Sequence, residues 1–252
     1  MTPGEASRYL ARIGHAGPAS PSLETLRVLH RLHLRTVPFE NLSVREGKEI
    51  PLVEASLFDK IVSRRRGGFC YELNGLFAAL LQGLGFHVSL LAGRVGVDGI
   101  PFDHMALRVD LDEAWLADVG FGDSFLEPIR LGERAPQDGG DGRSYRLDGD
   151  DDGLLLRRLE SGSWARQYRI DPGKWPLSAF EEGCRYHSTS PRSPFTQKTV
   201  VTRATEEGRI TLSERRLITT VRGSRSESEL PDDASVTRAL AERFGLVPES
   251  VR

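Results

Sequence analysis

Apolar residues recur every three to four positions through most of the first 85 residues, which is the period of helices with one buried face. The pattern predicts helices over Glu5–Ile13, Val53–Ser63 and Cys70–Leu84. It predicts a further helix that has Ser20 as its N-cap and Pro21 as its first residue, and that ends before Pro38. Gly85 is suited to end the Cys70–Leu84 helix, because glycine readily adopts the left-handed conformation found at helix ends.

Beyond residue 85 the period changes to two, which indicates strands. Alternating apolar residues predict strands at Phe86–Leu90, Met105–Val109, Trp115–Val119, Leu154–Arg158, Arg166–Ile170, Thr199–Ala204 and Arg209–Leu212. The stretch Gln137–Gly153 is rich in Gly and Asp, so we expect mobile turns around one short strand, Tyr145–Leu147. Asp233–Phe244 returns to helical spacing. Helices followed by sheet predict an α+β chain.

Composition narrows the function classes. The 252 residues are 38% hydrophobic, enough to bury a core. The chain has 34 basic and 36 acidic residues, so its net charge is -2. Because so small a charge does not attract phosphate backbones or anionic lipids, we expect neither nucleic acid nor membrane as a partner. The first residues lack a leader pattern and the longest apolar run, Leu76–Leu81, is too short to span a bilayer, so a cytoplasmic location is expected. Cys70 and Cys184 form no Cys-x-x-Cys pair, which favours free thiols and no metal site.

Cys70 is the candidate nucleophile. It follows Gly67, Gly68 and Phe69 at the start of a predicted helix. A thiol attacks as its thiolate, and a free cysteine with a pKa near ~8.5 is only slightly ionised at neutral pH. Because unpaired N–H groups at a helix start and a nearby imidazolium both favour the anion, we expect a lowered pKa. The alternative is a small, inert, buried side chain.

His104 and Asp118 are the candidates for a base and for the group that orients it. His104 lies at the start of the strand pattern Met105–Val109, and a strand end holds a side chain rigidly. Asp118 lies in an otherwise apolar strand, where an unpaired carboxylate is costly, so it needs a partner such as His104. A carboxylate at one ring nitrogen fixes the tautomer and stabilises an imidazolium. Alternatively, His104 is a satisfied imidazole at a strand edge and Asp118 a solvated acid.

The turn between these strands decides whether His104 and Asp118 share a sheet face, because side chains alternate along a strand. A two-residue turn at Asp112–Glu113 would pair Leu107 with Asp118 and direct the carboxylate away from His104. An odd loop such as Leu111–Glu113, or a bulge, brings the two side chains together. We therefore predict an odd loop or a bulge.

Several motifs, in order along the chain, are those of a known family. They are Val37-Pro38-Phe39-Glu40-Asn41, Arg66-Gly67-Gly68-Phe69-Cys70-Tyr71-Glu72-Leu73-Asn74, His104-Met105, Asp118-Val119-Gly120-Phe121-Gly122, Ser188-Thr189-Ser190-Pro191 and Ser193-Pro194-Phe195. With these motifs, the sequence resembles the arylamine N-acetyltransferase family over most of its length.

The resemblance implies an α+β fold in three parts: an N-terminal helical bundle at 1–85, a central antiparallel barrel-like sheet domain at 86–190, and a C-terminal α/β lid at 191–252. It implies a ping-pong cycle without a bound cofactor, in which acetyl-coenzyme A acetylates Cys70 and a small aromatic amine or hydrazine takes the acetyl group. His104 would move the protons. Pocket-lining residues by the same resemblance are Phe39, Phe121 and Phe195, and the Cys70 N–H is an oxyanion donor. A monomer or homodimer is expected.

Other functions stay open at this point. Amide synthases that close macrolactams from a carrier-bound thioester share the triad. A cysteine hydrolase or transglutaminase also uses Cys, His and Asp in this order, although the papain-type context is absent and 104 minus 70 leaves only 34 residues between base and nucleophile. A binding module with an inactive triad is a further alternative, which an inert thiol would reveal.

Four more residues have expected supporting roles. Arg66 and Glu72 are expected to be structural partners of the Cys70 loop. Cys184 and His187 lie three positions apart, so on a strand they would point to opposite faces. We therefore expect no second active site there, and a local hydrogen-bonding role for His187.

Overall fold

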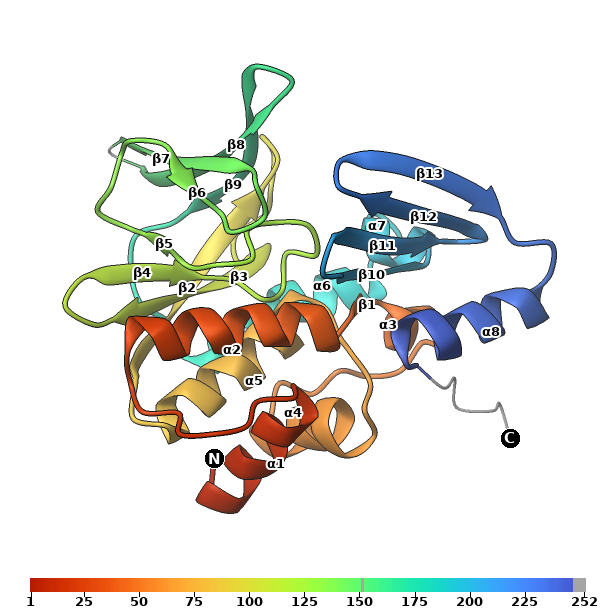
Figure 1. Cartoon of the computed structure of the whole chain (residues 1–252), viewed down its shortest axis with the longest axis horizontal. Helices are drawn as coiled ribbons and strands as arrows, with labels where there is room; N and C mark the ends of the chain where they lie inside the picture. The colour runs from red at the N-terminus through yellow and green to blue at the C-terminus, as the bar shows by residue number, and fades with distance from the viewer. Residues whose placement is uncertain (151, 247–252) are drawn as a thin grey trace.

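The computed structural model describes residues 1–150 and 152–246, and its elements form three groups (Figure 1). Helices of the N-terminal part lie beneath an eight-stranded antiparallel sheet, and a five-stranded sheet with the last helix lies beside them. The predicted α+β class and barrel-like central sheet are confirmed. The predicted boundaries at residues 85 and 190 remain predictions, and residues 151 and 247–252 of the predicted parts lie outside the described residues.

The N-terminal helices follow the predicted pattern closely. They are α1 (Pro3–Arg12), α2 (Leu23–Thr36), α3 (Leu42–Arg45), α4 (Glu54–Phe58), the π-helical turn η1 (Asp59–Ser63) and α5 (Cys70–Gly83). The predicted cap at Ser20 is wrong: Ser22 is the N-cap of α2, because its Oγ accepts the Thr25 N–H at 3.1 Å. Gly85 has φ +93°, the left-handed conformation expected just past a helix end.

The eight-stranded sheet has the strand order β5-β4-β3-β2-β9-β8-β7-β6. Its strands are β2 (His87–Val95), β3 (His104–Asp110), β4 (Ala114–Ala117), β5 (Ile129–Arg130), β6 (Gln137–Asp138), β7 (Ser144–Asp150), β8 (Gly153–Glu160) and β9 (Ser163–Ile170). The side chain of Gln137 accepts from the Arg130 N–H at 2.7 Å and donates to the Arg130 carbonyl at 3.0 Å. These bonds link the two edge strands, so the sheet nearly closes into a barrel.

The Gly- and Asp-rich stretch holds more structure than predicted. Instead of turns around one short strand, it contains β6 and the seven-residue strand β7, whose Tyr145 and Leu147 are fully buried. Tyr145 packs edge-on against Phe125 with ring centroids 5.6 Å apart. Two apolar residues at a spacing of two are enough to anchor an otherwise polar strand, because only one face of it must be buried.

The five-stranded sheet joins distant parts of the chain. Its order is β1-β10-β11-β12-β13, with β1 (Phe39–Glu40), β10 (Val200–Ala204), β11 (Gly208–Ser213), β12 (Arg216–Val221) and β13 (Ser224–Glu229). The predicted β10–β11 hairpin and the helix α8 (Asp233–Phe244) are confirmed, whereas β12 and β13 were not predicted. The segment between the sheets holds the 3-10 turn η2 (Leu177–Phe180), α6 (Glu181–Thr189) and α7 (Pro194–Gln197).

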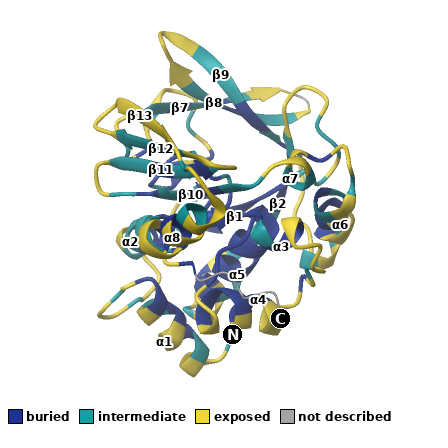
Figure 2. Ribbon diagram, turned by 90° about the vertical axis from the view of Figure 1, so that its right-hand side faces the viewer, coloured by how far each residue is buried: buried dark blue, intermediate teal, exposed yellow. Residues whose placement is uncertain are grey.

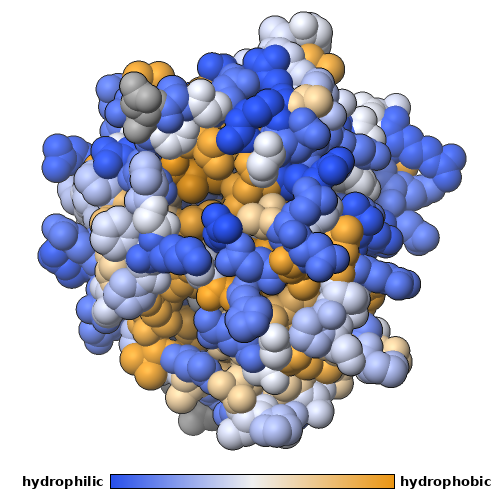
Figure 3. Space-filling view, turned by 90° about the vertical axis from the view of Figure 1, so that its left-hand side faces the viewer, coloured by the Kyte–Doolittle hydropathy of each residue, from blue (hydrophilic) through white to orange (hydrophobic). Residues whose placement is uncertain are grey.

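The largest core lies between the helices and the sheet face that carries Met105, Leu107 and Val109. Helix α5 passes through it and is buried along nearly its whole length (Figure 2). On the face shown in Figure 3, apolar patches lie among hydrophilic side chains. Within the described ranges, no helix is long and apolar enough to cross a membrane.

Two buried histidines on α2 make the fold sensitive to acid. Burial lowers the pKa of His30 to about 4, and it lowers the pKa of His33 well below the ordinary value. Neither ring nitrogen of His33 has a hydrogen-bond partner among residues 1–150 and 152–246. Between pH 6.5 and 4 the unfolded chain therefore binds protons that the folded chain does not, so stability is lost as the pH falls.

Replacing His33 should reduce this acid sensitivity. In His33→Leu we expect the free energy of unfolding to depend less on pH between 6.5 and 4, by roughly 1.4 kcal/mol per pH unit for one proton. Urea unfolding across that range measures the slope. His87→Gln, a change at an exposed histidine, is the control and should leave the slope unchanged. An equal slope in wild type and His33→Leu would contradict the prediction.

Candidate active site

Cys70 is the first residue of α5, and the loop before it is tightly held. The Glu72 side chain accepts the Phe69 N–H at 3.2 Å, which occupies one of the N–H groups that the start of a helix leaves open. A Cβ at Gly67 would lie 2.0 Å from the Pro38 carbonyl oxygen, so only glycine fits there. The glycines thus let the chain turn sharply into the helix and present Cys70 at its first position.

The β3–β4 hairpin has the predicted odd loop. Asp110 pairs with Ala114, which leaves the three residues 111–113 as the turn, and Leu107 pairs with Ala117. In this register His104 and Asp118 fall on the same face, as the parity argument requires. His104 Nε2 lies 2.8 Å from Asp118 Oδ2, and both side chains are almost fully buried. The predicted pairing of these two residues is confirmed.

The Asp118 carboxylate is held as an anion. Burial acts to raise its pKa, but the charge and hydrogen bond of His104, a bond from Asn74 and the Gly120 N–H together hold the pKa below the ordinary value. Asn74 Nδ2 donates to Oδ1 at 2.8 Å and the Gly120 N–H donates to the same oxygen at 2.9 Å. With Nε2 of His104 donating to Oδ2, its Nδ1 is left as the nitrogen that can accept a proton.

Two residues that orient the acid were not singled out from the sequence. Asn74 also donates to the Met105 carbonyl at 2.6 Å and accepts the Val119 N–H at 2.9 Å, so it joins α5 to β3 and to the segment after β4. The sequence signals for Asn74 were its place at the end of the Arg66–Asn74 motif and its position one helical turn after Cys70. His30 Nε2 accepts the Asp118 backbone N–H at 3.0 Å, which makes His30 a neutral imidazole that donates from Nδ1 to Leu126. No local sequence pattern could predict the contact between His30 and Asp118, because the two residues are 88 positions apart.

Cys70 and His104 line a cleft of about 750 Å³. The three predicted pocket residues, Phe39, Phe121 and Phe195, line the same cleft. They come from β1, from the loop after β4 and from α7, so the cleft lies where the three groups of elements meet. The Phe121 ring stands edge-on to the His104 imidazole at 5.2 Å between centroids.

The loop after Asp118 lies against the start of α5. A Cβ at Gly120 would come within 2.7 Å of the Cys70 Cα and of Asn74 Nδ2, closer than side chains pack. A side chain at this position would therefore push the segment after β4, which carries Asp118, away from the thiol.

The expected lowering of the Cys70 pKa is not found. Burial raises the pKa of the thiol well above its ordinary value, and the charge of Asp118 adds to the rise, while a hydrogen bond from the Met105 backbone opposes it. The sequence argument counted the helix start and the imidazole but not the desolvation of a side chain that is only 4% exposed.

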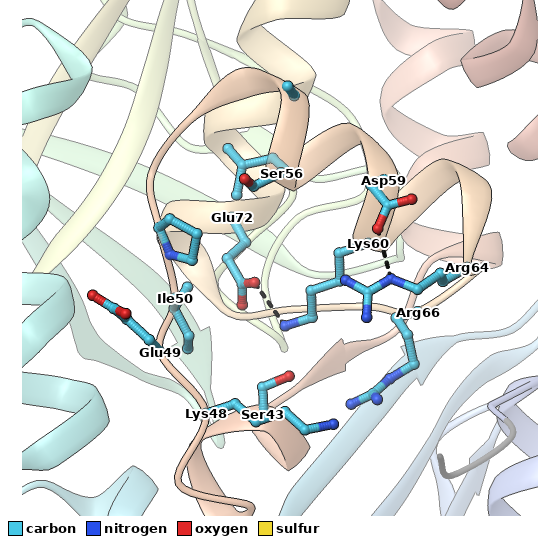
Figure 4. Close-up of a pocket in the computed structure, with 13 residues that line it drawn as sticks. Ser43, Lys48, Glu49, Ile50, Ser56, Asp59, Lys60, Arg64, Arg66 and Glu72 are labelled. Atoms are coloured by element: carbon cyan, nitrogen blue, oxygen red, sulfur yellow. Dashed lines mark hydrogen bonds and ion pairs between the residues drawn. The ribbon is translucent and has the colours of Figure 1, made fainter.

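A second cavity, of about 450 Å³, lies behind the nucleophile loop (Figure 4). In it, Lys60 Nζ is 2.6 Å from the Glu72 carboxylate, the same carboxylate that accepts the Phe69 N–H. Arg66 forms a buried ion pair with Glu40 at 3.1 Å. The structure thus confirms Arg66 and Glu72 as structural partners of the Cys70 loop.

Loss of Lys60 should destabilise the protein far more than loss of its exposed neighbour Arg64. Lys60→Met leaves Glu72, whose side chain is 2% exposed, without its cation, and we expect a loss of about 3 kcal/mol or more in the free energy of unfolding. The Arg64–Asp59 pair in Figure 4 is about half exposed on both sides, so Arg64→Met should cost less than about 1 kcal/mol. Urea unfolding measures both variants, and equal losses would contradict the prediction.

Cys184 and His187 lie on a helix, not on a strand. Both are on α6, where residues three apart share a face, so the expectation of opposite faces is wrong. The sequence of α6 is too polar to show a clear helical stripe. Their contacts still differ: Cys184 Sγ lies 3.8 Å from the Ile50 carbonyl oxygen, whereas His187 bonds to Ser193 and Asp103. The local hydrogen-bonding role predicted for His187 is confirmed.

Comparisons with known proteins agree with this geometry. A family model described as N-acetyltransferase matches residues 22–250. The arylamine N-acetyltransferase of Escherichia coli is 37% identical, over 98% of this chain and 90% of the relative. The chain belongs to the arylamine N-acetyltransferase family. It is therefore an acyltransferase, and this replaces the cysteine hydrolase and the inactive binding module as interpretations.

Solved structures of arylamine N-acetyltransferases superpose over nearly the whole chain. The enzyme of Salmonella typhimurium has a TM-score of 0.94 and 32% identity, covering 100% of this chain and 94% of the other. The Mycobacterium marinum enzyme in complex with CoA has a TM-score of 0.90 and 33% identity, covering 95% and 92%. One relative is named as a synthase and not as an acetyltransferase. It is the proansamycin X synthase of Amycolatopsis mediterranei, which is 31% identical over 96% of this chain and 98% of the relative.

Proposed function

We propose that this arylamine N-acetyltransferase moves an acetyl group from acetyl-coenzyme A to the nitrogen of an aromatic amine or hydrazine through a thioester on Cys70. The observation that carries the proposal is that Cys70, at a helix start, and His104 line one cleft, and that the buried Asp118 carboxylate lies 2.8 Å from the imidazole. Similarity to a family member that forms a complex with CoA supports the donor. In this proposal Cys70, His104 and Asp118 are the catalytic residues.

The first half of the cycle acetylates the enzyme. His104 Nδ1 takes the Cys70 proton, so the neutral pair becomes a thiolate and an imidazolium, and Asp118 stabilises the positive ring. The thiolate attacks the acetyl carbon and the carbonyl electrons move to oxygen. Since Cys70 is the first helical residue, its N–H has no helical carbonyl to bond and can donate to this oxyanion. The carbonyl re-forms, coenzyme A leaves as its thiolate, and His104 returns the proton to it.

The second half transfers the acetyl group. The acceptor nitrogen attacks the thioester carbon, His104 takes the proton that this nitrogen loses, and the Cys70 sulfur leaves and recovers its proton from the imidazolium. Phe39, Phe121 and Phe195 are the proposed pocket residues for the acceptor. Flat aromatic walls suit an aromatic amine, because ring contacts bury apolar surface and leave the nitrogen directed at the thioester.

Intact-protein mass spectrometry tests the proposal. Acetyl-coenzyme A alone should add one acetyl group, peptide mapping should place it on Cys70, and an arylamine such as 4-aminobenzoate should remove it and gain the acetyl group. Failure to form the adduct would overturn acetyl-coenzyme A as the donor. An adduct on any other residue would overturn the proposed nucleophile.

The similarity to proansamycin X synthase favours one alternative, an amide synthase that uses a carrier-bound acyl thioester. In that case a pantetheine-linked aromatic acyl thioester would load Cys70 faster than acetyl-coenzyme A does. Competition between the two donors in the same mass measurement separates the reactions.

A further inference from the structure

His187 connects two walls of the catalytic cleft. Its Nε2 lies 2.7 Å from Asp103 Oδ1, and its Nδ1 lies 3.1 Å from Ser193 Oγ. Asp103 directly precedes His104 in sequence and also accepts the Val95 N–H at 2.9 Å. Ser193 accepts the Phe195 N–H at 3.2 Å, and the Phe195 ring stands edge-on to His187 at 5.3 Å between centroids. His187 thus joins the loop of the base to the Phe195 wall.

The hydrogen-bond donors at this junction can be assigned. The helical partner of the His187 carbonyl would be the N–H of residue 191, but that residue is proline and has none. The Ser193 hydroxyl lies 3.1 Å from this carbonyl and supplies the missing donor. Assigning the one hydroxyl hydrogen to this carbonyl leaves Ser193 Oγ to accept from His187 Nδ1, which then carries a proton.

The other ring nitrogen must donate as well, because the Asp103 carboxylate can only accept. A ring with a proton on both nitrogens is an imidazolium. The side chains of His187 and Asp103 are 7% and 11% exposed, so the pair is shielded from solvent. The polar and aromatic side chains that face His187 from the elements around it are Asp103, Tyr71, Ser193, Phe195 and Tyr186.

We propose that His187 is a positioning residue for the Cys70–His104 pair: as an imidazolium it clamps the Phe195 wall to Asp103 and cancels the charge of that carboxylate beside the nucleophile. The inference rests on the proposed function, in which Cys70 must become an anion. Burial is the main cause that raises the Cys70 pKa, and the negative charge of Asp103 adds to it. A cation on Asp103 therefore favours the thiolate.

Alkylation of Cys70 by iodoacetamide, followed against pH, tests the charge effect. In a Cys184→Ala background, His187→Gln keeps a polar side chain but removes the cation. We expect the alkylation midpoint to move up by about one pH unit, which slows alkylation at neutral pH about tenfold. His187→Gln with Asp103→Asn removes both charges and should restore the midpoint. An unchanged midpoint in His187→Gln, or no restoration in the double variant, would overturn the inference.

Ring-nitrogen NMR of the wild-type enzyme tests the charge state directly. We expect His187 to show two protonated ring nitrogens at neutral pH, and a neutral ring would overturn the inference even if the variants fail to fold. Both measurements are independent of acetyl transfer. Failure of Cys70 to accept an acetyl group would therefore refute the proposed function while the shift in the His187→Gln midpoint still stood.

Discussion

Cys70→Ala should lose turnover by roughly 10⁵-fold or more, because no other group at the cleft can carry the acetyl thioester. Acetyl-coenzyme A should leave the variant's mass unchanged, since the acetylation step itself is removed. The rate of arylamine acetylation and the intact mass are the two measurements. Cys70 packs in the main core, so a thermal unfolding curve must show that the variant remains folded.

The chain offers a matched control in its second cysteine. Cys184 is also buried, and burial raises its pKa to about 12, so it resembles Cys70 in exposure, but its Sγ contacts the Ile50 carbonyl oxygen and not an imidazole among the described residues. Cys184→Ala should keep turnover within a few-fold of wild type. Equal losses in the two variants would indicate that cavities in the core, not loss of the nucleophile, explain the effect.

Asp118→Asn should lower turnover by about 10⁴-fold with the fold intact. The new amide oxygen can still accept from Asn74 and Gly120, so the amide nitrogen must face His104. That nitrogen donates, which forces Nε2 of His104 to accept and places the ring proton on Nδ1. Nδ1 is then unable to take the proton from Cys70, and both halves of the cycle stop.

Alkylation at neutral pH separates this effect from misfolding. The Asp118→Asn variant should unfold near the wild-type temperature but react slowly with iodoacetamide, because the thiolate loses its base. Asp110→Asn, at the other end of β3, is the control and should alter neither property. A normal alkylation rate in Asp118→Asn would show that Cys70 ionises without the His104–Asp118 pair.

The sequence predicted the elements whose signal is local. Helix α8 has the predicted bounds, and the loop 111–113 has the odd length that the parity of His104 and Asp118 demanded. Such features follow from periodicity and from a single buried charge that needs a partner. With the family motifs, they were sufficient to place the three proposed catalytic residues.

What the sequence did not show depends on contacts between distant residues. Strand β13 is exposed along its whole length, so it carries no alternation, and its pairing with β12 supplies the order. Burial lowers the pKa of His30 and keeps its ring neutral, and its bonds to Asp118 and Leu126, which lie far along the chain, fix which ring nitrogen carries the proton. Desolvation of the Cys70 thiol likewise arises from the packing of distant residues around it, so it cannot be predicted from the local motif.

The strand β1 has a consequence for folding during synthesis. Phe39 and Glu40 are made before the eight-stranded sheet, yet their partners in β10 are Thr202 and Val201, which are made after it. The Glu40 N–H also bonds to the Gly68 carbonyl at 2.8 Å, in the loop that leads to the nucleophile. The β1–β10 side of the catalytic cleft is thus completed only after the helices α1 to α5 and the whole eight-stranded sheet have emerged, so a shorter nascent chain holds its thiol in an unfinished site.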